Sequence, residues 1–141
     1  MTNATENKIV TPEQRRAKAA WKVAQTLKDE KACDDFFKLC KKTASRILNS
    51  GLMPALAFLT SKKDDGQNAS VLNAFKDQLS SNGLFVFVIG NQNTLLDRLV
   101  QNADGTMLRR AQSEALSYLE WLARFAEGRA IELKPKEGGV E

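Results

Sequence analysis

The chain has 141 residues, of which 43% are hydrophobic, enough to bury the core of a single domain without disulfides or a bound metal. It contains no histidine, which excludes Ser-His-Asp and Cys-His catalytic groups and zinc sites built from two Cys and two His. No stretch approaches the roughly 20 apolar residues of a membrane span, and the N-terminus lacks the layout of a signal peptide. We therefore expect a cytoplasmic protein that is not an enzyme and has no membrane contact, no cofactor and no metal site.

The net charge of +4 is unevenly distributed. Residues 1–63 contain thirteen Lys and Arg against six Asp and Glu, whereas residues 64–141 contain eight against eleven. The first part of the chain is therefore basic and the second slightly acidic. Such asymmetry favours an anionic partner for the basic part, most naturally a phosphate backbone, although the charge alone is also compatible with a role in solubility.

Residues 1–10 are polar and predict a flexible arm, followed by a helix from Thr11 to about Asp29. Thr11 is suited to be the N-cap, with Pro at the first helical position and Gln14 completing a capping box. The apolar face consists of small residues together with Trp21. Three basic residues follow one flank and are either a solvated face or a contact for nucleic acid: Arg15, Lys18 and Lys22.

Helical periodicity predicts a second helix over about residues 32–49. Its expected core stripe contains Cys33, Phe36, Phe37, Cys40, Ala44, Ile47 and Leu48. Cys33 and Cys40 are two turns apart on the same face of the helix, about 10 Å, so we expect both to be buried but too far apart to form a disulfide. The outward side carries four cations, Lys38, Lys41, Lys42 and Arg46. These like charges repel one another, and a bound anion would reduce that repulsion.

Gly51 is predicted to end the second helix in a left-handed conformation, and a third helix follows over residues 52–59. This helix is apolar nearly all round, so we expect it at the buried centre of a bundle. Residues 61–68 predict an exposed loop. A fourth helix, stopped by Asn82-Gly83, is indicated by apolar spacing at Val71, Leu72, Phe75 and Leu79.

Residues 84–90 have the composition of a buried strand, but no other segment offers a pairing partner, which favours a short helix or an extended connector. Thr94 is expected to cap a short fifth helix that residues 102–105 interrupt. A long amphipathic helix over residues 111–126, closed by Gly128, comes last. Trp121 projects away from its core stripe and needs a second surface, either a neighbouring helix or a protein partner.

These elements predict an all-α fold: one compact bundle of five to seven helices over residues 11–128, between the arm at 1–10 and a disordered tail at 129–141.

Two stretches carry a resemblance to a known family. Residues 51–62, Gly-Leu-Met-Pro-Ala-Leu-Ala-Phe-Leu-Thr-Ser-Lys, and residues 115–126, Ala-Leu-Ser-Tyr-Leu-Glu-Trp-Leu-Ala-Arg-Phe-Ala, are similar to segments of the small subunit of the type III-B CRISPR RAMP effector, the Cmr complex. Residues 16–20 are compatible with the N-terminal helix of that family, whereas residues 84–105 match no part of its pattern.

The resemblance implies a small, all-helical, non-catalytic subunit that stacks as a filament beside larger backbone subunits, through which a crRNA guide pairs with target RNA. We therefore expect the other Cmr subunits, crRNA and target RNA as partners, with self-stacking copies, in antiviral defence. The seven basic residues named above, Arg15, Lys18, Lys22, Lys38, Lys41, Lys42 and Arg46, would contact RNA phosphates, and Trp121 would contact protein.

Two other classes of function remain open. The same patches suit a helical adaptor or regulator that binds another protein or, as a dimer, duplex DNA, although no helix-turn-helix is evident. The other alternative is a metal-dependent nuclease built on Asp64 and Asp65 with Asp97 or Asp104. Adjacent carboxylates on a loop rarely converge on one ion, so we do not favour it.

Overall fold

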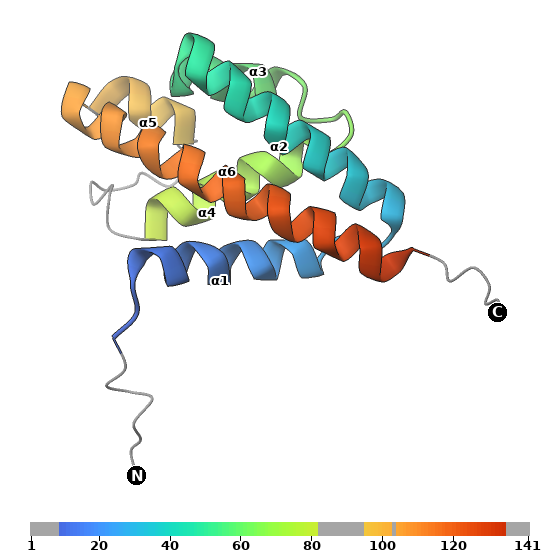
Figure 1. Ribbon diagram of the computed structural model, residues 1–141. Helices are drawn as coiled ribbons and strands as arrows, with labels where there is room; N and C mark the ends of the chain where they lie inside the picture. Colours follow the sequence, from blue (N-terminus) through green and yellow to red (C-terminus); the bar gives the residue numbers. More distant parts are fainter. Residues whose placement is uncertain (1–8, 82–94, 103, 135–141) are drawn as a thin grey trace, which may run out of the picture.

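The computed structural model describes residues 9–81, 95–102 and 104–134, which form six α-helices and no strand. The all-α class is therefore confirmed, and the six helices fall within the predicted range for these residues. Their bounds are α1 Pro12–Gln25, α2 Glu30–Ser50, α3 Leu52–Ser61, α4 Asn68–Ser81, α5 Leu95–Asn102 and α6 Gly105–Leu133 (Figure 1).

The 29-residue helix α6 is the surface on which the other elements assemble. Helices α1 and α2 make the most extensive contacts with it, and α3 and α4 pack against both α2 and α6 (Figure 1). Aromatic and aliphatic side chains from these helices meet in one core, whose largest fully buried members include Tyr118, Phe36 and Phe75. The basic helices α1 and α2 therefore both owe their positions to α6.

Polar side chains fix where three of the helices begin. The Thr11 hydroxyl accepts a hydrogen bond from the Gln14 backbone N–H, and the Gln14 side chain accepts one from the Thr11 N–H, so the predicted capping box is confirmed. Asp29 caps α2, and Asp104 caps α6. Helix α1 ends at Gln25, four residues short of the prediction, because the chain must turn before Asp29 can cap the next helix.

Gly51 is the single residue between α2 and α3. Its φ of +96° is positive as predicted, but its ψ of 168° is extended, so it is not in the left-handed helical conformation. This geometry folds α3 back onto α2 at once. The prediction that α3 lies at the buried centre of the bundle is wrong, because Pro54 and Ala57 are exposed and only the opposite face is buried.

Two large side chains assigned to core faces are exposed. Leu48 is 70% exposed and Trp21 is 50% exposed. Both lie at an edge of their apolar stripe, where the neighbouring helices cover them only in part. Each therefore adds apolar surface to the outside of the domain.

Helix α6 does not end near Gly128 as predicted, but continues to Leu133. A glycine inside a helix lowers its stability by about 1 kcal/mol relative to alanine. Tertiary contacts around Gly128 offset this loss. Ala126 and Ala130 are buried, and the Arg129 guanidinium donates to the Leu27 carbonyl at 3.3 Å. The prediction of a disordered tail from residue 129 is thus wrong for residues 129–133.

Several predictions fall on residues outside the described part of the chain. They concern the arm at 1–8, the end of the fourth helix at Asn82-Gly83, the segment 84–90, the Thr94 cap and the tail at 135–141. Within the described residues, no helix is long and apolar enough to cross a membrane.

Both cysteines are buried and free, as their positions on the α2 stripe predict. Burial raises the pKa of the Cys33 and Cys40 thiols, because a thiolate loses its hydration in the core. Both thiols therefore remain protonated at neutral pH and act as small apolar side chains.

We expect Gly128→Ala to stabilise the protein by roughly 0.5–1 kcal/mol, raising the melting temperature by about 2–4 °C. A Cβ at Gly128 meets nothing within 4 Å, so the gain in helix propensity meets no clash. Gly51→Ala is the matched control and should destabilise, because φ is +96° there. Calorimetry of both variants checks this, and a lower melting temperature for Gly128→Ala would contradict a continuous α6.

We also expect neither cysteine to react with an aromatic disulfide reagent at pH 8 in the folded protein, because the thiolate is the reactive form. Reaction should become complete in denaturant. Absorbance of the released thiol measures both rates, and rapid reaction of one native thiol would show that its part of α2 opens readily.

Candidate nucleic-acid interface

Three of the four basic residues of α1 lie along its outer side. Arg15, Lys18 and Lys22 are all exposed, and none forms an ion pair with another described residue. Their spacing of three and four residues places them on neighbouring turns of one helix face. The structure thus brings these three predicted residues together as one cationic surface, which we call the α1 row.

The basic residues of α2 divide between two directions. Lys38 and Lys42 are exposed and lie one turn apart. Lys41 is also exposed, but its ammonium group lies 5.8 Å from the centre of the Phe37 ring, toward α6. Lys31 extends the cationic side of the helix and is paired with Asp35 at 3.0 Å. We call Lys38, Lys41 and Lys42 the α2 row.

Arg46 does not lie on the outward side as predicted. Its guanidinium carbon stacks 3.6 Å above the centre of the Phe58 ring of α3, and its Nη1 is buried without a hydrogen-bond partner. The cause is the one-residue connection at Gly51, which makes α3 an immediate neighbour of α2. Packing of Arg46 against an aromatic ring leaves it less suited to bind a phosphate than the α2 row.

The α1 row and the α2 row do not form one continuous surface. Their helices each pack along α6 and have little contact with one another, with α6 running between them (Figure 1). The exposed ridge of α6 carries charges of both signs at Glu120, Arg124 and Glu127. The predicted second row is therefore a separate cationic surface.

A groove of about 500 Å³ lies between α2 and α6. Its lining is mixed, with the apolar side chains of Phe37, Leu116 and Leu119 beside the charged side chains of Lys41 and Arg124. The exposed Leu48 lies at this groove. The groove was not anticipated from the sequence, because it depends on how far apart the two helices pack.

Trp121 finds its second surface within the domain. It is partly buried and packs on Phe125, with ring centres 5.4 Å apart. Phe125 in turn forms a T-shaped pair with Trp21 of α1, with ring centres 5.3 Å apart and an interplanar angle of 86°. Trp121 also borders a cleft of about 310 Å³ shared with Glu13, Glu120 and Arg124. A role for Trp121 in binding a protein partner stays a prediction.

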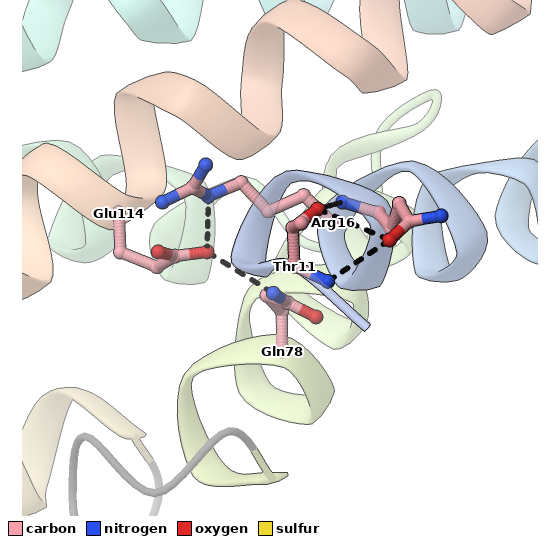
Figure 2. Close-up of polar contacts among 5 residues, drawn as sticks. Thr11, Arg16, Gln78 and Glu114 are labelled. Carbon is pink, nitrogen blue, oxygen red and sulfur yellow. Dashed lines mark hydrogen bonds and ion pairs between the residues drawn. The ribbon is translucent and has the colours of Figure 1, made fainter. Parts of the chain in front are cut away.

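A buried polar network, missed at the sequence level, joins three helices (Figure 2). The Arg16 Nε donates to Glu114 Oε2 at 2.9 Å, and the Gln78 amide donates to the same oxygen at 3.0 Å. Glu114 is only 7% exposed. The sequence did contain a signal, because Glu114 interrupts the apolar stripe of α6 between Ala111 and Tyr118. Arg16 is thereby withdrawn from the outer surface that its neighbours share.

The carboxylates considered for a nuclease are widely distributed. Asp64 and Asp65 are exposed on the loop between α3 and α4, Asp104 caps α6, and Asp97 belongs to α5. Across the described ranges, no three cysteine, aspartate or glutamate side chains gather where they could hold a metal ion.

The fold and the surface define an all-helical protein whose distinguishing features are two cationic helices packed on a central one. The family model for CRISPR-associated protein (Cas_Cmr5) matches residues 12–129, which include α1 and most of α6. The chain belongs to this family, the small subunit of the type III-B Cmr complex. No curated protein matches the chain.

Removing the Arg16 guanidinium should destabilise the domain, because it leaves the Glu114 carboxylate buried without its cation. We expect Arg16→Met to cost about 2–4 kcal/mol and the double variant Arg16→Met/Glu114→Met to recover most of this loss. Urea unfolding provides the measurement. Lys31→Met, which removes an exposed pair, should leave stability unchanged. Additive losses in the double variant would contradict a coupled pair.

Proposed function

We propose that the chain is a non-catalytic RNA-contacting subunit of the type III-B effector complex, acting in antiviral defence in the cytoplasm. The proposal is supported by the family match together with the α1 row and the α2 row, whose lysines have no carboxylate partners among the described residues. In this role the chain follows the phosphate backbone of crRNA or target RNA without reading its sequence, because ammonium groups contact phosphates irrespective of the bases.

The α2 row is our main candidate for this contact. Lys38 and Lys42 lie on neighbouring turns and project to solvent, so neither needs to break an internal bond in order to bind a phosphate. Lys41 stands beside them at the edge of the α2–α6 groove. The α1 row of Arg15, Lys18 and Lys22 supplies a second contact on the other side of α6. Two separate surfaces suit a subunit that touches nucleic acid at more than one place.

We also propose that copies stack beside the backbone subunits as a filament. The α2–α6 groove with the exposed Leu48 and the cleft beside Trp121 are mixed polar and apolar surfaces that support such contacts. Each copy meets few phosphates, so stacking would raise RNA affinity through multivalency. The absence of histidine from the sequence and the separation of the described carboxylates support a role in assembly over one in catalysis.

Reversing the charge of the α2 row should weaken RNA binding without unfolding the protein. For Lys38→Glu/Lys42→Glu we expect weaker binding to single-stranded RNA and a log–log salt dependence reduced by about 1.4, if each lysine meets one phosphate. The matched control is Lys62→Glu/Lys63→Glu, which makes the same charge change on the exposed α3–α4 loop. Fluorescence anisotropy over a salt series measures both variants.

Equal weakening in the two variants would show that only net charge matters and would contradict a specific α2 surface. The same RNA incubated with Mg²⁺ or Mn²⁺ tests the non-catalytic role. Cleavage that disappears in Asp64→Ala/Asp65→Ala would overturn it in favour of a nuclease.

A further inference from the structure

We propose that Trp21 is a stacking platform for an unpaired base of single-stranded RNA. This inference rests on the proposed RNA-binding function and adds to it a contact that phosphate-binding lysines cannot make. Stacking on an aromatic side chain is tolerant of sequence, because every base has a π-face. It would hold the strand even where the surrounding charges are screened.

Trp21 is exposed but held in place. Half of its surface is open to solvent, although a tryptophan normally contributes most of its area to a core. The Trp21 ring meets Phe125 edge to face at 5.3 Å, and Phe125 is supported from the other side by Trp121 at 5.4 Å. Trp21 is thus held by Phe125, which Trp121 supports in turn, so a base that stacks on Trp21 has little side-chain motion to restrict.

The exposed cations of α1 lie to one side of this ring. Lys18 lies one turn before Trp21 and Lys22 directly follows it, within about 100° of Trp21 around the helix axis. Arg15 continues the row toward the start of the helix. The remaining cation of α1, Arg16, points inward to Glu114. An aromatic ring with unpaired cations beside it matches the combination that a nucleotide presents, a flat base joined to a phosphate.

A small cleft of about 120 Å³ continues from Trp21 toward α6. Phe125 and Gly128 border it, and Gly128 leaves open the space that a side chain would occupy. The Gln25 amide also borders the cleft and forms no hydrogen bond within the described residues, so it is available to a polar base edge.

The charges favour RNA over a protein partner. The carboxylate that borders this cleft, Glu132, is already paired with Arg129 at 3.4 Å. Lys18 and Lys22 form no ion pair with a described residue, so a docking protein would have to supply acidic residues around an apolar anchor. Single-stranded RNA supplies its phosphates with every base.

The test compares two polymers of equal charge, a fluorescently labelled decamer of uridylate and an abasic ribose-phosphate decamer, on the full-length chain. We expect the uridylate decamer to bind about 5- to 150-fold more tightly, the range that corresponds to roughly 1–3 kcal/mol per stacked base. Trp21→Ala should abolish this ratio, and Trp21→Phe should restore part of it. Thermal melting of each variant establishes that the fold is retained.

A second measurement does not depend on deleting the ring. The chain contains two tryptophans, so Trp121→Phe leaves Trp21 as the only one. Its fluorescence should be quenched by the uridylate decamer and hardly changed by the abasic polymer.

The possible outcomes separate this inference from the function on which it rests. Equal, salt-dependent affinity for both polymers would overturn stacking at Trp21 and leave the phosphate contacts in place. Failure to bind either polymer would overturn both proposals. If Trp21→Ala left the affinity ratio intact but prevented co-purification with other Cmr subunits, Trp21 would be a protein anchor, and the stacking inference would be wrong.

Discussion

Glu114 is the point at which α1, α4 and α6 are fixed relative to one another. Its carboxylate accepts hydrogen bonds from Arg16 and Gln78 in a largely buried position, where an unpaired charge is strongly disfavoured. This requirement sets the rotation of α1 on α6. With Arg16 directed inward, Arg15, Lys18 and Lys22 are left on the outside beside Trp21. An internal ion pair thus decides which side chains of a very basic helix remain available to a ligand.

On the other side of α6, the connection between helices plays the corresponding role. The single glycine between α2 and α3 brings Phe58 under Arg46, which takes one cation out of the α2 surface. Lys38 and Lys42 stay in solvent, while Lys41 leans over Phe37 at the groove. The cationic surface of α2 is therefore smaller than helical spacing suggests. On each helix a tertiary contact holds one arginine apart from the exposed cations: Arg16 pairs with Glu114, and Arg46 stacks on Phe58.

Local signals predicted much of this fold. The capping box at Thr11, the core stripe of α2 around Cys33 and Cys40, and the all-helical class depend on interactions within a few residues. The failures concern distant contacts. Gly128 looked like a helix end because glycine often is one, but packing of Ala126 and Ala130 keeps α6 continuous. Of the candidate site, the exposure of the lysines was predictable, whereas the positions of Arg46, Trp21 and the groove required knowing which helices are neighbours.

The order of the helices along the chain has a consequence for synthesis. α6 is the last described helix to be made, yet it provides the surface against which α1 and α2 bury their apolar faces. The bond between Arg16 and Glu114 spans 98 residues. A nascent chain that still lacks α6 can pair α2 with α3 through their short connection, but it leaves α1 without its main partner. The domain therefore completes its core only after α6 has left the ribosome, and the apolar face of α1 lacks its main partner until then.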